Sequence, residues 1–137
     1  GHVQDEWEVV GVACRHAVTL PRGQISLTAD LTEATAVRRL FAEARPDAVL
    51  HLAALADPNA CQREPAHSLA VNVTASVILA EACAAAGIPC VFTSTDLVFD
   101  GRHAPYDETV PPAPVNWYGE HKLLAEKFWM AVLWWIL

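Results

Sequence analysis

The chain has 137 residues, which is enough for one domain or for part of one. Hydrophobic residues make up 53% of it and charged residues 18%, so it can bury a core. The formal net charge of -7 argues against nucleic acid or an anionic membrane surface as a partner, because both attract positive protein surfaces. The four cysteines form no C-x-x-C pair. We therefore expect reduced, buried thiols in a cytoplasmic protein, with no disulfide and no metal site.

Strand and helix patterns alternate along the first half of the chain. Apolar runs predict strands over residues 8–13 and 24–28. Residues 32–44 follow with apolar side chains at helical spacing, which predicts an amphipathic helix. A proline turn then leads into residues 48–52, an apolar run of strand length. Its His51 is expected to be a satisfied core histidine.

The second half continues this alternation. A long helix is predicted over residues 65–86, with Gly87 as its stop, and a strand over residues 89–94. A loop rich in Pro, Gly and Asp covers 96–117, and a further helix starts near Tyr118. Apolar strands separated by helices indicate a parallel sheet covered on both faces. The predicted fold class is α/β, a partial doubly wound Rossmann-type parallel sheet that takes up the whole chain.

Tyr118 and Lys122 are four residues apart in the last predicted helix and therefore share one of its faces. An ammonium near a phenol favours the phenolate and lowers the pKa of the phenol. Thr95, which follows the preceding strand, can hold a substrate oxygen beside that phenol. Together the three suit proton transfer to or from a carbonyl and its alcohol. An ordinary surface pair is the alternative, and Thr93 or Ser94 takes the place of Thr95 if the strand register differs by one.

Candidate ligand-binding residues follow the predicted strands, and ligands of open parallel sheets bind beyond the carboxyl ends of the strands. Small residues there let a flat ring approach the backbone, a carboxylate can accept a hydrogen bond from an adenine amine, and an arginine can pair with a ribose 2′-phosphate. This arrangement suggests a nicotinamide dinucleotide, NADP(H) or NAD(H). Asp30 with Glu33 fits a helix-capping pattern equally well, and Arg15 also fits a solvated loop residue. The candidates are Arg15, Asp30, Leu31, Ala53 and Ala54.

The chain resembles the extended short-chain dehydrogenase/reductases, and most of all the dTDP-4-dehydrorhamnose reductase branch. The resemblance covers roughly residues 8–127, and its specificity comes from the combination of motifs rather than from any one of them. The matching stretches are Asp30-Leu-Thr, Pro46-Asp-Ala-Val-Leu-His-Leu-Ala-Ala54, Val71-Asn72-Val, Ser94-Thr-Asp-Leu-Val-Phe-Asp-Gly101, Tyr106-Asp-Glu108, Pro114-Val-Asn-Trp-Tyr-Gly119 and Lys122-Leu-Leu-Ala-Glu126.

The resemblance implies a role for each matching residue. Tyr118 would be the general acid that protonates a ketone oxygen as hydride arrives from the nicotinamide. Lys122 would lower the pKa of Tyr118 and hydrogen-bond the nicotinamide ribose, and Thr95 would orient the carbonyl. The remaining implied roles are adenine contact for Asp30 and Leu31, lining of the cofactor cleft for Ala53 and Ala54, sugar contact for Val98 and Asn116, and fixing of the neighbouring backbone for Asn72.

The implied function is NAD(P)H-dependent reduction of the 4-keto group of a nucleotide-linked deoxysugar. A sugar-nucleotide epimerase or dehydratase of the same superfamily is one alternative. A non-catalytic regulatory subunit, similar to the one that binds methionine adenosyltransferase, is the other. The expected partner is a nucleotide-sugar substrate, with no nucleic acid and no membrane, and homodimer formation is left open.

The sequence also departs from the family's pattern. The family opens with a strand and a glycine-rich turn that holds the cofactor pyrophosphate, and it continues into a C-terminal substrate-binding segment. This chain has neither, and its first strand corresponds to the family's second. The absent strand is central in a doubly wound sheet, so its gap must close, be filled by another chain, or prevent folding. We expect no useful activity from this fragment alone, an expectation that robust ketone-dependent NADPH oxidation would refute.

The end of the chain, Phe128–Leu137, is a run of ten apolar residues. That is too short to span a bilayer, for which about 20 are needed. We expect it to be a buried or dimer-forming helix end, and the alternatives are a truncated membrane anchor or a sequence artefact at the edge of the fragment.

Overall fold

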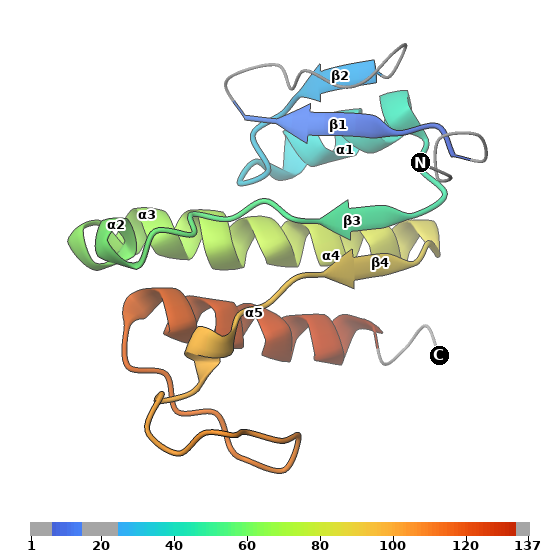
Figure 1. Cartoon of the computed structure of the whole chain (residues 1–137). Coiled ribbons are helices and arrows are strands. Elements are labelled where there is room, and N and C mark those ends of the chain that lie inside the picture. Colours follow the sequence, from blue (N-terminus) through green and yellow to red (C-terminus); the bar gives the residue numbers. More distant parts are fainter. Residues whose placement is uncertain (1–6, 15–24, 134–137) are drawn as a thin grey trace.

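Four parallel strands and a set of helices form the protein in a computed structural model that describes residues 7–14 and 25–133 (Figure 1). All four arrows in Figure 1 point the same way, so the carboxyl ends of the strands meet at one edge. The α/β fold class with parallel strands is confirmed. The strands are β1 (Val10–Ala13), β2 (Ile25–Thr28), β3 (Val49–His51) and β4 (Cys90–Phe92).

The strands form two separate two-stranded sheets. β1 pairs with β2, with Val10 opposite Ile25, and β3 pairs with β4, with Val49 opposite Cys90. In space the order is β2-β1-β3-β4, and β1 and β3 are not hydrogen-bonded to each other (Figure 1). Of the outcomes expected for the absent central strand, closure by re-pairing is therefore excluded for these strands.

The gap between the two sheets is bordered by backbone groups without a strand partner. The carbonyl of Ala13 accepts the N–H of the residue after β2, at 3.0 Å, so the backbone groups of Ala13 point to β2 and those of its neighbour Val12 point into the gap. On the other side of the gap, the N–H of Val49 donates to the carbonyl of the residue before β4, at 3.0 Å, so the backbone groups of Leu50 point into the gap. Apolar side chains line the resulting slot, which has a volume of about 370 Å³.

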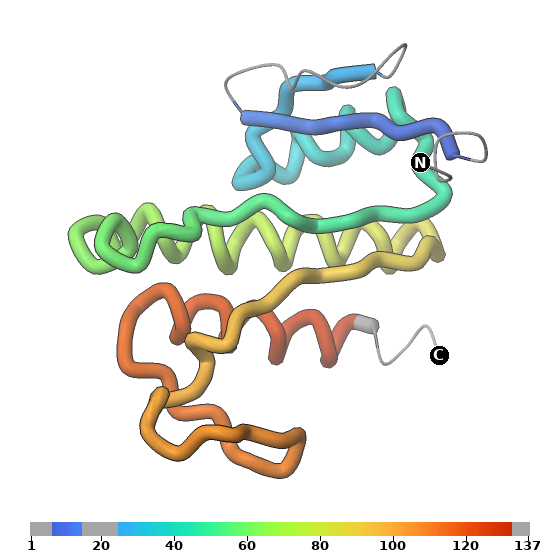
Figure 2. Tube along the Cα trace, in the orientation of Figure 1, coloured from blue at the N-terminus to red at the C-terminus, as the bar shows by residue number. Residues whose placement is uncertain are grey.

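Three helices lie on one face of the strands: α1 (Ala34–Ala44), α4 (Ala75–Ala86) and α5 (Trp117–Leu133) (Figure 2). α4 packs against both α1 and α5 and so forms the centre of this helical layer. On the other face, Leu50 and Val91 are 69% and 57% exposed. The prediction of a sheet covered on both faces is therefore wrong for the described residues, because all of the long helices lie on one side.

The predicted helix over 65–86 is present, but it is not uniform. It consists of α3 (Pro65–Leu69), a π-helical turn η2 (Ala70–Thr74) and α4, and it ends at Gly87 as predicted. Gly87 has φ of 66°, a left-handed conformation that glycine adopts without a steric penalty. The widened turn is the kind of irregularity that often marks a functional segment of a helix.

Helix α2 (Pro58–Arg63) precedes this segment and was not predicted. Its signal is nevertheless in the sequence. The side chain of Asp57 accepts the backbone N–H of Asn59 at 2.9 Å, and Pro58 occupies the first helical turn. Both residues are favoured at a helix start.

The stretch Pro65–Ala86 is also the one described helix that is long and apolar enough to cross a membrane by length and composition. Ser68, Asn72 and Ser76 are buried on it and hydrogen-bonded to other parts of the protein. It packs against α1 and α5 as well. These contacts make it the core helix of the domain.

The described cysteines are all free. Cys61 and Cys83 are buried, as expected, and Cys90 is partly buried. Cys14 is exposed, so the expectation of buried thiols is wrong at this position. The reason is that Cys14 follows the carboxyl end of β1, at the open edge of the sheet.

The open gap predicts a pattern of backbone hydrogen exchange. The amide of Leu50, which faces the gap, should exchange at least about tenfold faster than that of His51, which faces β4. Val12 should likewise exchange faster than its neighbour Ala13. Amide exchange followed by NMR checks this, and equal protection at Leu50 and His51 would show that the gap is closed in solution.

Candidate functional site

Helix α5 begins with a side-chain cap and presents a buried stripe to the rest of the protein. The side-chain oxygen of Asn116 accepts the N–H of Gly119 at 2.8 Å, and its carbonyl accepts the N–H of Glu120 at 3.0 Å. The helix starts at Trp117, one residue before the predicted start. Its buried positions recur at the spacing of one helical face, namely Tyr118, His121, Lys122, Ala125 and Trp129.

The start of α5 packs tightly against the turn that contains Thr95. This turn is a short 3-10 helix, η3 (Asp96–Val98), and the Thr95 hydroxyl accepts the N–H of Leu97 at 3.2 Å. A Cβ atom at Gly119 would collide with the carbonyl oxygen of Leu97, so only glycine permits this approach. The structure thus brings the Thr95 turn and the helix of Tyr118 and Lys122 together.

Lys122 is a buried lysine, only 2% exposed, with two partners on and after β4. Its Nζ donates to the carbonyl oxygen of Thr93 at 2.6 Å. It also lies 3.9 Å from the centre of the Phe92 ring, a cation–π distance. Burial lowers the pKa of Lys122 to about 8, and the charge of Glu126 opposes this shift. The ammonium is therefore held at the carboxyl end of β4.

Tyr118 differs from expectation in its electrostatics. The phenol is 8% exposed, and its pKa is raised, first by burial and then by electrostatic interaction with Cys61 and Asp96. The expectation that Lys122 lowers this pKa is wrong for this structure. The reason is that the Lys122 ammonium is directed at the Thr93 carbonyl, and burial lowers the pKa of Lys122 itself.

The Phe92 ring that contacts the Lys122 ammonium belongs to an aromatic cluster. The Phe92 ring stacks on Trp129, one end of the α5 stripe, with centroids 5.2 Å apart. His51 lies 5.5 Å from Phe92 and 6.0 Å from Trp129. His51 is 2% exposed and hydrogen-bonded to Ser76, so it is the satisfied core histidine that the sequence predicted. Burial first, and then Lys122, lowers the pKa of His51 to about 4.

The apolar end of α5 is only partly buried. Trp129 is 3% exposed, whereas Phe128 and Met130 are 44% and 66% exposed. In the described part of this apolar run, the expected buried helix end is thus present on one face of α5 only, and residues 134–137 lie outside the described residues. Homodimer formation stays open.

Asn72 links the π-helical turn to the segment that follows β3. Its side-chain oxygen accepts the N–H of Leu55 at 2.8 Å, and its side-chain nitrogen donates to the Leu55 carbonyl at 3.1 Å. The side chain is 1% exposed. Asn72 therefore fixes the neighbouring backbone, as the family resemblance implied. The π-helical turn itself left no clear signal in the sequence.

The predicted cofactor residues lie at the carboxyl edge of the strands. Asp30, Leu31 and Ala53 all line one small, mainly apolar pocket of about 100 Å³, and Ala13 lines it from β1. Ala54 follows directly and is partly buried. Arg15 lies outside the described residues.

Asp30 also has a local structural role. Its carboxylate accepts the N–H of Thr32 at 2.9 Å and the hydroxyl of Thr32 at 2.7 Å. Helix α1 begins only at Ala34, after Glu33. The capping pattern predicted for Asp30 with Glu33 is therefore wrong, because Asp30 stabilises a turn before the helix instead.

Both predicted sugar-contact residues make structural contacts. Val98 is 6% exposed, so its side chain belongs to the core. Asn116 uses its side-chain oxygen to cap α5. The loop that follows Val98 is tied down by internal bonds, including the N–H of Thr109 to the carboxylate of Asp107 at 2.8 Å. Asp107 thus serves the fold of the loop.

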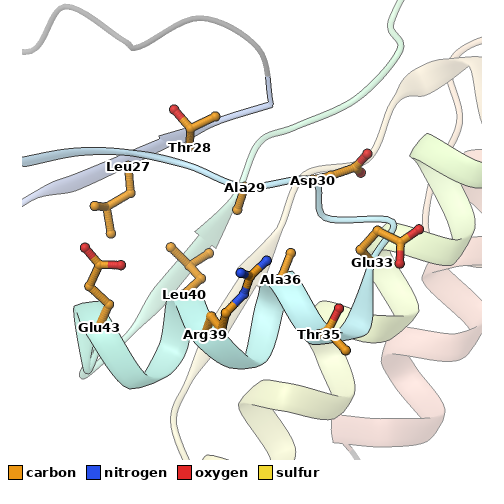
Figure 3. Close-up of a pocket in the computed structure, with 10 residues that line it drawn as sticks. All are labelled: Leu27, Thr28, Ala29, Asp30, Glu33, Thr35, Ala36, Arg39, Leu40 and Glu43. Carbon is orange, nitrogen blue, oxygen red and sulfur yellow. The ribbon is translucent and has the colours of Figure 1, made fainter.

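A pocket of about 570 Å³, larger than the slot between the two sheets, lies between β2 and α1 (Figure 3). Figure 3 shows Arg39 between Glu43 at one end and Glu33 at the other. It contains Asp30 but none of Thr95, Tyr118 or Lys122. Size alone therefore does not identify a reactive site. The buried Lys122 ammonium and Tyr118 phenol, whose pKa values are both shifted, mark the candidate site instead.

The fold is the Rossmann-type fold that solved dTDP-4-dehydrorhamnose reductases and sugar-nucleotide epimerases share. The family model described as RmlD substrate binding domain matches residues 3–133, and the chain belongs to this family. The predicted resemblance to the dTDP-4-dehydrorhamnose reductase branch is thereby confirmed.

Relatives of two kinds match the sequence. Methionine adenosyltransferase 2 subunit beta from Xenopus tropicalis is 34% identical over 124 residues, which cover 90% of this chain and 36% of that protein. dTDP-4-dehydrorhamnose reductase from Burkholderia thailandensis is 41% identical over 99 residues, covering 72% of this chain and 33% of the reductase. The chain thus spans about a third of the length of these relatives.

Solved structures give the same picture. dTDP-4-dehydrorhamnose reductase from Bacillus anthracis, solved in complex with NADP, has a TM-score of 0.75 and 25% identity over 90% of this chain and 49% of its own. UDP-glucose 4-epimerase from Thermotoga maritima, solved with UDP-glucose, has a TM-score of 0.84 and 25% identity, covering 96% of this chain and 45% of the epimerase.

Gly119 provides a test of how the site is assembled. Gly119→Ala should destabilise the fold by about 1–3 kcal/mol, because the new methyl group meets the Leu97 carbonyl and Pro114. Urea unfolding measures this. Glu120→Ala, at the exposed next position, is the matched control and should change stability by less than about 0.5 kcal/mol. Equal stability of the two variants would mean that α5 does not pack on the Thr95 turn in this way.

The lowered pKa of Lys122 predicts a pH dependence of stability. Between about pH 8 and the ordinary lysine value near 10.4, the unfolded chain holds a proton on Lys122 that the folded chain has lost. Stability of the wild type relative to Lys122→Met should therefore rise with pH in this window, by up to about 1.4 kcal/mol per pH unit. Below pH 8 the difference should be constant. Urea unfolding at several pH values tests this, and parallel pH curves for the two proteins would contradict it.

Proposed function

We propose that this chain carries the proton-donor half of an NAD(P)H-dependent reductase acting on the 4-keto group of a nucleotide-linked deoxysugar. The observation that carries the proposal is the buried pair of Tyr118 and Lys122 on α5, packed against the Thr95 turn at the carboxyl end of β4. Membership of the RmlD family supports this reaction class.

Tyr118 is the proposed general acid. Its raised pKa keeps the phenol protonated at neutral pH, which is the state that a proton donor to a ketone oxygen must have. Thr95 is the proposed hydrogen-bond donor that orients the carbonyl beside it. In the described structure its hydroxyl is 3.2 Å from a carboxylate oxygen of Asp96, a contact that it would exchange for the substrate.

Lys122 is proposed to bind the cofactor ribose and to keep positive charge near the developing alkoxide. A nicotinamide cofactor would supply the hydride to the ketone carbon. The chain's residues fit such a group in two places. Asp30, Leu31 and Ala53 border a small apolar pocket at the carboxyl edge that suits an adenine ring, and Lys122 lies at the end of β4. NADP or NAD is bound by solved relatives, and both remain candidates.

The gap between β1 and β3 bears on this function. It lies between the part of the sheet that holds Asp30 and the part that holds Lys122. The described residues place no glycine-rich turn there to bind a pyrophosphate. We propose that full activity requires a further strand in the gap, which would supply those backbone N–H groups.

Cofactor binding by the chain tests the proposal. NADPH or NADH at 100 times its dissociation constant should stabilise the wild type by about 2.7 kcal/mol, measured as a rise in the unfolding midpoint. Lys122→Met should lose most of this effect, whereas the matched control Lys127→Met, at an exposed position of the same helix, should retain it. Equal shifts in all three proteins, or none in the wild type with either cofactor, would contradict the assignment of Lys122.

A regulatory subunit is the second candidate function. It is favoured by the match to methionine adenosyltransferase 2 subunit beta over 90% of this chain. Binding of this chain to a purified methionine adenosyltransferase catalytic subunit would support this alternative. Because we expect no useful activity from this chain alone, turnover of a dTDP-4-keto-6-deoxysugar with NADPH by a longer protein that includes the further strand would support the reductase.

A further inference from the structure

His121, the residue before Lys122, is buried at 5% exposure and had no role in the sequence interpretation. Its Nδ1 lies 2.8 Å from the hydroxyl of Ser68, which is fully buried in α3. On its other side the imidazole stacks on Trp117, with centroids 5.5 Å apart. This hydrogen bond joins α3 to α5, and the two bonded residues are 53 positions apart in the sequence.

The direction of this hydrogen bond follows from Asn72. The backbone of Leu55 fixes the orientation of the Asn72 side-chain amide. If the amide oxygen and nitrogen were exchanged, the Asn72 NH2 group would face the Leu55 N–H, and the Asn72 oxygen would face the Leu55 carbonyl oxygen. The Asn72 nitrogen, so oriented, also donates to the Ser68 hydroxyl oxygen at 3.2 Å. The Ser68 oxygen could accept a second hydrogen bond, but among the described residues the Ser68 proton has no acceptor other than Nδ1 of His121, so Ser68 donates and Nδ1 accepts. The imidazole carries its own proton on Nε2.

A charged imidazole does not fit this arrangement. Protonated Nδ1 would bring a second donor to Ser68 and leave the Ser68 hydroxyl proton without an acceptor in a buried place. The pKa of His121 is lowered, mainly by burial and against the opposing charge of Glu120, in agreement with a neutral ring.

We propose that the Ser68–His121 hydrogen bond is a latch that fixes the rotation of α5 about its axis and thereby places the Tyr118 phenol and the Lys122 ammonium. The three α5 residues share one face, so a rotation that released His121 would move the other two with it. His121 is thus a positioning residue. The functional meaning of the latch rests on the proposed cofactor role of Lys122.

The pKa of Lys122 reports the position of its ammonium and needs no activity. We would titrate lysine 13Cε signals by NMR in the full 137-residue chain, as wild type and as Ser68→Ala, His121→Leu and His121→Asn. A neutral imidazole has no net charge, so its removal acts on Lys122 through position. Loss of the latch in Ser68→Ala and His121→Leu should raise the Lys122 pKa by about one unit, as the ammonium leaves its buried place. His121→Asn should keep the wild-type value, because the Asn side-chain oxygen can take the place of Nδ1.

The same Lys122 pKa in all four proteins would overturn the proposal, as would 15N spectra that place the His121 proton on Nδ1. Ser68→Ala removes one hydroxyl and decides the question even if His121→Leu does not fold. NADPH titration of the same four proteins separates the two proposals. If the wild type binds NADPH, the two latch-breaking variants should bind it about fivefold more weakly. If it does not, the cofactor role fails while the Lys122 titration still tests the latch.

Discussion

The contact of the Lys122 ammonium with the Thr93 carbonyl and the Phe92 ring connects the helical layer to the carboxyl end of β4. A buried ammonium is unfavourable unless its charge is compensated, and here its lowered pKa shows that the compensation is incomplete. The surrounding structure holds it nonetheless. Trp129 and His51 support the Phe92 ring, and α5 packs on the helix Pro65–Ala86. A residue that is retained at a cost to stability in this way is typical of a functional site.

A second constraint is the split sheet. Residues proposed to contact the adenine follow β2 and β3, and Tyr118 and Lys122, the proposed reactive pair, lie beyond β4. The π-helical turn and Asn72 connect these parts through Leu55, so the segment after β3 is fixed even though β1 and β3 do not pair. The protein thus holds the reactive side of the site by side-chain hydrogen bonds and helix packing. The described residues do not supply the pyrophosphate-binding turn, which in a nicotinamide site follows a central strand.

Most of the helices and strands could be predicted from the sequence, because strand length, helical spacing and the helix stop at Gly87 are local signals. The tyrosine and lysine spacing located the α5 face, and the short runs after the strands located the carboxyl edge. The sequence could not give the electrostatics of Tyr118, which depend on burial by residues distant along the chain. Nor could it give the burial of Val98 or the capping role of Asn116, since both depend on how the loop before α5 folds back. His121 was missed because its partner, Ser68, is 53 residues away.

The central claim is that the carboxyl edge, from Asp30 to Lys122, forms one cofactor site. The most direct test is a titration of the 15N-labelled chain with NADPH, followed residue by residue in NMR spectra. The account predicts that the largest shifts occur at Leu31, Ala53 and Lys122, on both sides of the open gap. Shifts confined to the pocket between β2 and α1, with none near Lys122, would contradict it.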